Sequence, residues 1–305
     1  MTAPPALTSS TAARRASFRG TDAGVLMSLA SMSCVQLGLA LSVRLFDQLG
    51  PVGTTALRLT WAGLLLLVLV RPRRSDFTGR DLLVCLGLGV VTAGLMLLFM
   101  CAVARIPLGT ASALEFLGPL GVAMFGSRGG RKLWASLAAV GVVLLTEPWH
   151  GGSDPVGLGL ALAAAGCWAG YILLTQRVGD RVTGLNGLAV SMPVAALVAT
   201  LFAGPSALAS VTWSLVLTGL ALAVLHPVIP FSLEFLALRR LSTTAFGTLM
   251  SLEPAIALVI GAVTLGQLPG AGPAAGVVCV VLAGIGAART GSRTPASAEG
   301  ARPGG

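Results

Sequence analysis

Two stretches of the sequence, PLGTASALEFLGPLGVAMFGS (residues 107–127) and STTAFGTLMSLEPAIALVIGA (residues 242–262), decide the fold. Both are apolar, both are about as long as a membrane span requires, and each carries one glutamate before a proline. Pro119 and Pro254 are 135 residues apart. The same offset aligns three further pairs, namely Thr110 with Ala245, Gly126 with Gly261, and Gly141 with Gly276. We therefore predict a duplicated membrane segment, and carboxylates beside helix breaks at membrane depth are typical of transport proteins.

Composition places the chain in a membrane. Hydrophobic residues make up 55% of the 305 residues and charged residues only 10%, with a mean hydropathy of +0.88. A soluble domain carries about 25% charged residues, so most of this surface is expected to face lipid. The net charge of +9 does not indicate nucleic-acid binding, because the basic residues lie between apolar runs and form no basic helix face.

The sequence contains ten apolar runs of about 20 residues, the length that spans a hydrocarbon core. They lie at residues 24–43, 53–70, 82–103, 108–127, 132–149, 156–175, 184–203, 212–233, 242–265 and 269–288. We expect an all-α integral membrane protein with ten transmembrane helices, in two repeats that cover residues 21–150 and 151–288. Residues 1–20 and 289–305 are expected to be disordered cytoplasmic tails, although residues 1–20 also have the composition of a transit peptide.

The basic residues predict the orientation. If the N-terminus is cytoplasmic, seventeen Lys and Arg residues fall on the cytoplasmic side, and only Arg44 and Arg105 fall on the other. This asymmetry predicts that both termini lie inside. Because each repeat would contain five helices, the two repeats would be inverted relative to each other. Inverted repeats are a known route to exposing a central site alternately on the two sides of a membrane.

Glu115 and Glu253 are the leading candidates for binding substrate or protons. A carboxylate at membrane depth is costly unless it is neutral, paired or hydrated. A proline also frees the carbonyl four residues before it. Pro119 therefore frees the carbonyl of Glu115 itself, and Pro254 frees that of Met250. The alternative for each glutamate is a neutral carboxyl that packs between helices.

Three further polar residues lie inside apolar runs. Glu234 can bind substrate or pack as a neutral carboxyl, and both interpretations remain open. His226 lies between helix breaks expected at Pro227 and Pro230, where it can relay a proton or bond a freed carbonyl. Arg58 can bind a substrate carboxylate, pair with a glutamate, or extend to the membrane surface.

Other features narrow the class of function. Gln36, Trp168 and Tyr171 are candidates for lining a cavity, although aromatic residues at such spacing more often pack between helices. The five cysteines show no CxxC spacing, so we expect neither a metal site nor a disulfide. The sequence contains no nucleotide-binding or hydrolase motif, and we expect no cofactor and no enzymatic activity. An intramembrane enzyme would depend on His226 with a serine, and a sensor or scaffold would give no reason for an inverted duplication.

The segments ALEFLGPL (113–120) and TLMSLEPA (248–255), with the ten-helix plan, resemble the EamA-type family of drug/metabolite transporters. Within this family, residues 105–119 and 237–257 are most similar to the threonine/homoserine exporter subgroup. The resemblance covers residues 24–288. It implies an inner-membrane permease that exports small amino acids or related metabolites in exchange for protons. The alternative is efflux of drugs or of metabolites such as purines by the same fold.

The resemblance has one clear departure. The family has a glutamate after a glycine near the end of a helix, whereas this sequence reads LGQLP at residues 265–269 and places Gln267 there. The first repeat has SRGGRK at residues 127–132 instead. A role for that glutamate is therefore not expected here. The expected partners are a small-molecule substrate and the lipid bilayer, and a homodimer is left open.

Overall fold

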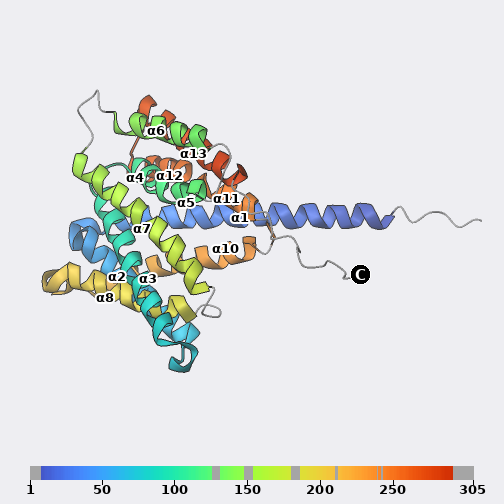
Figure 1. Ribbon diagram of the computed structural model, residues 1–305. Helices are drawn as coiled ribbons and strands as arrows, with labels where there is room; N and C mark the ends of the chain where they lie inside the picture. The colour runs from blue at the N-terminus through green and yellow to red at the C-terminus, as the bar shows by residue number, and fades with distance from the viewer. Residues whose placement is uncertain are drawn as a thin grey trace, which may run out of the picture.

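The structure is a computed structural model that describes residues 8–125, 131–147, 154–179, 186–209, 212–238, 240–241 and 243–290. Within these ranges the regular elements are all helical (Figure 1), which confirms the all-α prediction. In chain order they are α1 (Thr8–Val43), α2 (Phe46–Val70), η1 (Arg74–Asp76), α3 (Gly79–Val103), α4 (Leu108–Glu115), α5 (Leu117–Phe125), α6 (Arg131–Thr146), α7 (Pro155–Gly179), α8 (Asn186–Ala209), α9 (Trp213–Ala223), η2 (Val224–Val228), α10 (Ile229–Leu238), α11 (Thr243–Met250), α12 (Glu253–Leu265) and α13 (Ala271–Thr290).

Seven helical stretches of the described chain are long and apolar enough to cross a membrane. They are Asp22–Val43, Phe46–Val70, Gly79–Val103, Pro155–Val178, Asn186–Gly204, Ala245–Leu265 and Ala271–Arg289. Shorter apolar helices occupy Leu108–Met124, Lys132–Thr146 and Trp213–His226. Large apolar side chains such as Val263 and Phe202 are exposed on the outer surface. Such exposure is expected for a surface that contacts lipid. The chain is therefore a multi-pass membrane protein.

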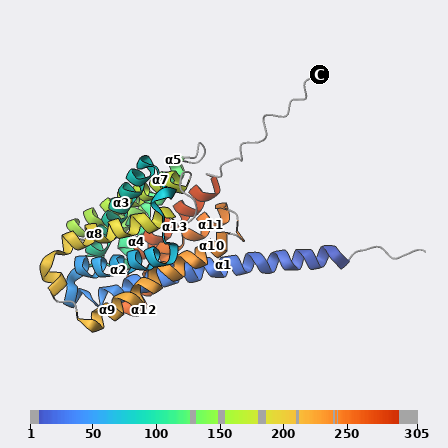
Figure 2. The ribbon, with the colours of Figure 1, turned by 90° about the horizontal axis from the view of Figure 1, so that it is seen from below.

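The start of α1 differs from the sequence-based expectation. The helix begins at Thr8 and runs through part of the segment 1–20 that composition predicts to be disordered. Alanine and arginine favour helix, and here the helix continues without a break into the first apolar run. Figures 1 and 2 show this part of α1 projecting beyond the other helices. Residues 1–7 and 291–305 lie outside the described ranges, so the terminal tails remain predictions.

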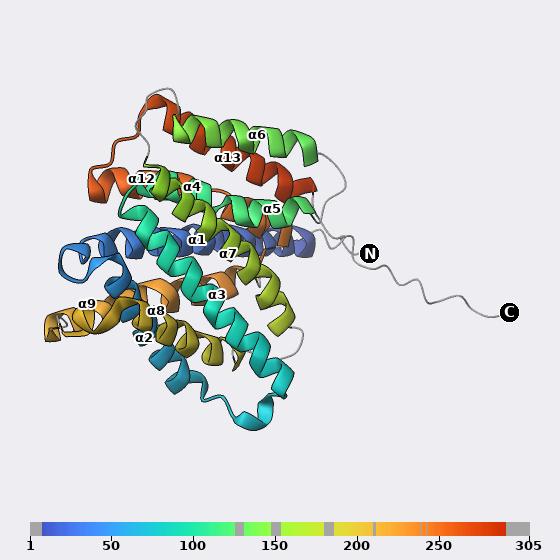
Figure 3. The ribbon, with the colours of Figure 1, turned by 60° about the vertical axis from the view of Figure 1, so that its left-hand side comes forward.

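The offset of 135 residues relates helices of the two halves. Adding 135 to the residue numbers of α4 gives those of α11. Adding 135 to the residue numbers of α3 gives the stretch that α9, η2 and α10 occupy together. Two pairs of helices related in this way also pack together, because α2 contacts α8 and α6 contacts α13, while α4 contacts α12, the helix after its counterpart α11. Figure 3 shows α6 and α13 side by side.

Two glycines that the offset aligns meet where α6 crosses α13. A Cβ atom added to Gly141 would lie 3.0 Å from the carbonyl oxygen of Gly276, and one added to Gly276 would lie 2.8 Å from that of Gly141. Small residues let helix backbones approach closely in lipid. The crossing therefore requires glycine at equivalent positions of both halves.

Prolines explain where the paired short helices break. α4 ends at Glu115, four residues before Pro119, and α11 ends at Met250, four residues before Pro254. These are the two carbonyls that the sequence analysis expects the prolines to free. The connecting residue Phe116 keeps right-handed helical angles. The chain thus changes its hydrogen bonding at each break and still continues in nearly the same direction.

A third break lies between α9 and α10. α9 ends at Ala223, four residues before Pro227, and the chain then forms the π-helical turn Val224–Val228. His226 has non-helical angles there, with φ −150° and ψ 92°. Isolated π turns are frequent at functional sites, and this one contains His226.

Candidate functional site

A cavity of about 270 Å³ is lined by residues of both halves. Its walls consist of Val35, Leu39, Thr55, Arg58, Leu59, Ala62, Thr92, Leu95, Met96, Phe99, Glu115, Trp168, Tyr171, Met192, His226, Pro230, Glu234, Met250 and Glu253. Ligand pockets measure about 300–1,000 Å³ for drug-sized molecules. This smaller cavity therefore suits a small metabolite.

Most of the residues that the sequence analysis singles out meet in this cavity. Its lining includes Glu115, Glu253, Glu234, Arg58, His226, Trp168, Tyr171 and Pro230. The other four candidates lie behind the wall or shape it: Gln36 contacts Glu253, Pro119 and Pro254 follow the helix breaks, and Pro227 belongs to the π-helical turn. Three carboxylates around one cavity repel one another when ionised. The arrangement therefore favours binding of protons or of a cationic group.

Gln36 connects three helices behind the cavity. Its Nε2 donates to Oε1 of Glu253 at 3.2 Å, and its Oε1 accepts from the hydroxyl of Ser112 at 3.4 Å. Gln36 lies on α1, Ser112 on α4 and Glu253 at the start of α12, and Gln36 is only 1% exposed. The other oxygen of Glu253, Oε2, is buried and has no hydrogen-bond partner among the described residues. One oxygen of this carboxylate is thus held in place and the other is available.

Glu234 is fixed in a similar way from α1. The hydroxyl of Ser31 lies 2.9 Å from Oε1 of Glu234 and 3.2 Å from the carbonyl oxygen of Pro230. A single serine therefore joins the carboxylate and the backbone of α10 to the first helix. Glu115 occupies the last position of α4 on another wall of the cavity.

Arg58 and His226 contact each other in the wall of the cavity. Nη2 of Arg58 bonds Nδ1 of His226, Nη1 lies 3.8 Å from Sδ of Met100, and Nε has no partner among the described residues. Arg58 is 6% exposed, so its predicted extension to the membrane surface is wrong. No described carboxylate lies within 4.0 Å of it, so pairing with a glutamate is not observed either.

The sequence analysis missed several hydroxyl groups. Thr55 and Thr92 line the cavity, and their hydroxyls also bond the carbonyls four residues earlier, of Pro51 and Leu88, at 2.8 and 2.7 Å. Serine and threonine commonly bond their own helix in this manner. No sequence pattern therefore separates the residues that face a cavity from those that do not.

Gln267, the departure from the family pattern, joins the two halves. Its Oε1 accepts a hydrogen bond from the backbone N–H of Leu108 at 2.9 Å. Leu108 is the first residue of α4, whose early N–H groups lack partners within the helix. A neutral amide can thus make this contact without the charge of a glutamate.

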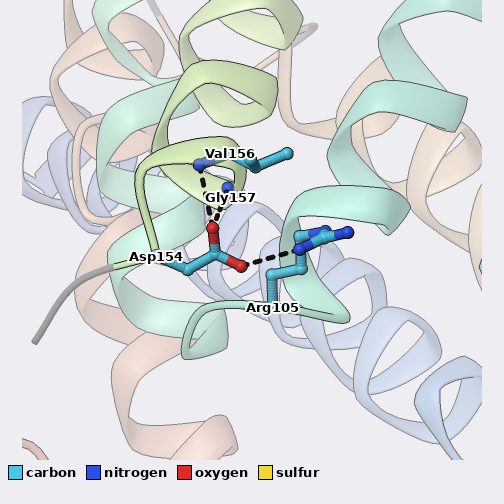
Figure 4. Close-up of polar contacts among 4 residues, drawn as sticks. All are labelled: Arg105, Asp154, Val156 and Gly157. Carbon is cyan, nitrogen blue, oxygen red and sulfur yellow. Dashed lines mark hydrogen bonds and ion pairs between the residues drawn. The ribbon is translucent and has the colours of Figure 1, made fainter.

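An ion pair outside the cavity joins the loop between α3 and α4 to the start of α7 in the second half (Figure 4). Nη1 of Arg105 lies 2.9 Å from Oδ2 of Asp154, whose Oδ1 accepts from the N–H groups of Val156 and Gly157 at 2.8 and 3.3 Å. Asp154 caps the first turn of α7. The hydrogen bond from Arg105 is the largest cause that lowers the pKa of Asp154, and the two backbone bonds add to it.

Comparison with known proteins identifies the family. The model of the EamA-like transporter family matches residues 22–146 and 155–288. The chain is 41% identical over 247 residues to the threonine/homoserine exporter RhtA of Salmonella typhimurium (strain LT2), which covers 80% of this chain and 83% of the relative. It is also 41% identical, over 250 residues with the same coverage, to the RhtA exporter of Escherichia coli K12.

A solved structure supports the same fold. A crystal structure described only as that of a protein aligns with a TM-score of 0.58 at 20% identity, over 88% of this chain and 96% of the other. At this sequence identity the match supports the fold and nothing about function. The two matched copies and the curated relatives confirm the predicted family resemblance, and they identify a transporter rather than an enzyme. The chain therefore belongs to the EamA-like transporter family.

Proposed function

We propose that this chain exports small amino acids of the threonine and homoserine type by exchange with protons. The observation that carries the proposal is the single cavity in which Glu115, Glu234 and Glu253 face Arg58. An amino-acid zwitterion carries an ammonium group that can pair with the glutamates and a carboxylate that can pair with the arginine. The names of the relatives, at 41% identity, supply the substrate class.

The proposed topology has ten crossings in two inverted repeats, with both termini in the cytoplasm and the protein in the plasma membrane. The seven long helices and the three shorter apolar helices supply ten candidate spans. The packing of α2 on α8 and of α6 on α13 agrees with a two-fold relation between the repeats.

Protons couple to substrate at the carboxylates in this proposal. Glu115 and Glu253 stand at the two proline breaks, where a change of charge also acts on the hydrogen bonding of the helices. A proton and a substrate ammonium compete for the same oxygens, which is the requirement for exchange. Glu253 is the better connected of the two, because Gln36 links it to both α1 and α4.

An export assay tests the proposal. Cells that lack their own exporters are fed dipeptides containing threonine, homoserine or a control amino acid, and the extracellular amino acid is measured with and without the protein. We expect threonine or homoserine to accumulate outside faster with the protein, and a proton gradient to drive the same flux in proteoliposomes. Export of a purine or a drug without export of any amino acid would contradict the substrate class.

A further inference from the structure

Arg58 is a buried cation without a counter-ion in the part of the chain that the structure describes. Its exposed fraction is 6%, no described carboxylate lies within 4.0 Å, and Nε lacks a partner. Removing a charge from water is expensive unless an opposite charge and hydrogen bonds compensate for it. A guanidinium at a cavity wall therefore points to an anion that enters the cavity.

His226 holds the guanidinium from the opposite half. Because Arg58 is a donor only, Nδ1 of His226 must accept, and the ring proton then resides on Nε2. The break at the π-helical turn gives His226 its non-helical angles, and α1 approaches so closely that a Cβ on Gly38 would lie 3.0 Å from Cβ of His226. The histidine is thus a positioning residue that holds one nitrogen of the guanidinium in the cavity wall, while the buried Nε keeps no partner among the described residues.

Helix N-termini at the cavity could also bind an anion, but neither the start of α12 nor the break before α5 is available for one. The helix α12 begins at the cavity, but Glu253 stands in its first turn, and a carboxylate there already compensates the positive end of the helix dipole. The break between α4 and α5 is a continuous right-handed turn in which Phe116 and Leu120 keep their backbone bonds. Arg58 is therefore the favoured anion site of the cavity.

We infer that Arg58, held by His226, binds the carboxylate of the exported molecule and makes the carboxylate a requirement for transport. This inference rests on the proposed function and deepens it. The substrate lies with its carboxylate at Arg58 and its ammonium group among the three glutamates. The apolar side chains of Leu39, Leu59 and Phe99 also line the cavity, and in this arrangement they contact the short side chain of the substrate. Compounds with an amine and no carboxylate, such as amino-acid amides and esters, are rejected.

The inference is tested by counterflow into proteoliposomes loaded with threonine. The competitors are threonine, threoninamide and threonine methyl ester, which keep the amine, and N-acetylthreonine, which keeps the carboxylate. A charge-assisted hydrogen bond contributes about 1.5–3 kcal/mol, so we expect the wild-type protein to prefer threonine over threoninamide by roughly 10- to 100-fold. Arg58→Gln should reduce this preference to about twofold, mainly through weaker binding of threonine.

Three variants keep the test decisive. Arg58→Lys retains the charge without the planar fork and should keep part of the preference. His226→Gln should lower the preference while the guanidinium stays. Arg44→Gln removes a surface arginine that donates to the carbonyl of Thr264 at 3.3 Å, and it should leave the preference unchanged. If Arg58→Gln does not fold, as judged by size-exclusion chromatography, then Arg58→Lys and His226→Gln decide.

The possible failures are distinguishable. If the wild-type protein moves no amino acid, the proposed function is wrong. If it moves threonine and the ratio of threonine to threoninamide is the same in the folded Arg58 and His226 variants, the proposed function stands and the carboxylate site is elsewhere. Equal competition by threoninamide and threonine in the wild-type protein would also overturn the inference.

Discussion

The two proline-broken helix pairs, α4–α5 and α11–α12, share one backbone plan and carry their carboxylates at different places. On the 135-residue offset, Glu115 corresponds to Met250, and Glu253 corresponds to Gly118. A Cβ atom on Gly118 would collide with the carbonyl oxygen of Ala165 on α7, so no glutamate fits there. In the second half the equivalent position faces Gln36 on α1, which bonds the carboxylate. In each half, the packing of the neighbouring helix therefore determines whether a carboxylate fits at this position of the shared backbone plan.

The same asymmetry holds for the other charged groups of the cavity. On this offset Glu234 corresponds to Phe99, Arg58 to Pro193, and His226 to Val91. Each ionisable residue thus has an apolar counterpart. A two-fold scaffold that moves between two equivalent conformations can therefore present one set of polar groups to both sides of the membrane.

The largest effect is expected at Glu115, where a substitution can remove the titratable charge and leave the fold unchanged. Glu115→Gln keeps the shape and the polar character of the side chain but cannot exchange a proton. We expect export of threonine to fall to background while the protein inserts and purifies like the wild type. Extracellular threonine and a size-exclusion profile measure the two properties. Asp47→Asn, which changes an exposed carboxylate that does not line the cavity, is the control and should export. Full export by Glu115→Gln would remove this residue from the mechanism.

The next effect tests why the two halves differ. Gly118→Glu places a carboxylate where Ala165 leaves no room, and we expect it to destabilise the fold by at least about 3 kcal/mol through crowding and a buried charge. Met250→Glu places a carboxylate on the cavity wall and should cost clearly less. Thermal unfolding in detergent measures both. Equal stability of the two variants would show that crowding at α7 does not explain the asymmetry.

Sequence reasoning found the backbone breaks because their cause is local. A proline disturbs the carbonyl four residues earlier whatever surrounds it, so the ends of α4 and α11 could be predicted. The ionisable candidates could also be found, since charge at membrane depth is costly, and all five of them line one cavity. Their partners could not be found. The contacts of Gln36 with Glu253 and of Arg58 with His226 depend on the rotation and height of helices far apart in the sequence.

A smaller effect is expected from the bridge that Gln36 makes between α1, α4 and α12. Gln36→Leu removes both bonds of the amide, with Glu253 and with Ser112, and we expect a loss of about 1–2 kcal/mol in the free energy of unfolding. Ser33→Ala is the control on the same helix, because its hydroxyl bonds only the carbonyl of Leu29 among the described residues, at 2.8 Å. It should change stability by less than about 0.5 kcal/mol. Equal losses from the two variants would argue that the bridge does not hold α1 to α4 and α12.

The smallest effect concerns two arginines that the offset also relates, Arg105 and Arg240. Arg105 pairs with Asp154, whereas Nη1 of Arg240 contacts Sδ of Met27 at 2.8 Å, and no described carboxylate lies within 4.0 Å of it. The pKa of Asp154 is lowered in the folded protein, so its contribution to stability is present above the unfolded value of about 3.9. That contribution is lost as the pH falls through the folded value.

We therefore expect Asp154→Asn to lower the unfolding temperature slightly at pH 7, and the difference from wild type to shrink once the pH falls below about 4. Arg240→Gln has no such partner to lose, and its effect should not follow the titration of a carboxylate. Unfolding temperatures of the three proteins in detergent, measured from pH 7 downward, give the comparison. A difference for Asp154→Asn that stays constant or grows as the pH falls would contradict the ion pair as its cause. Because the pair joins the loop before α4 to the first turn of α7, its loss also weakens an ionic contact between the two halves, whereas Arg240 contacts the other half through the uncharged Met27.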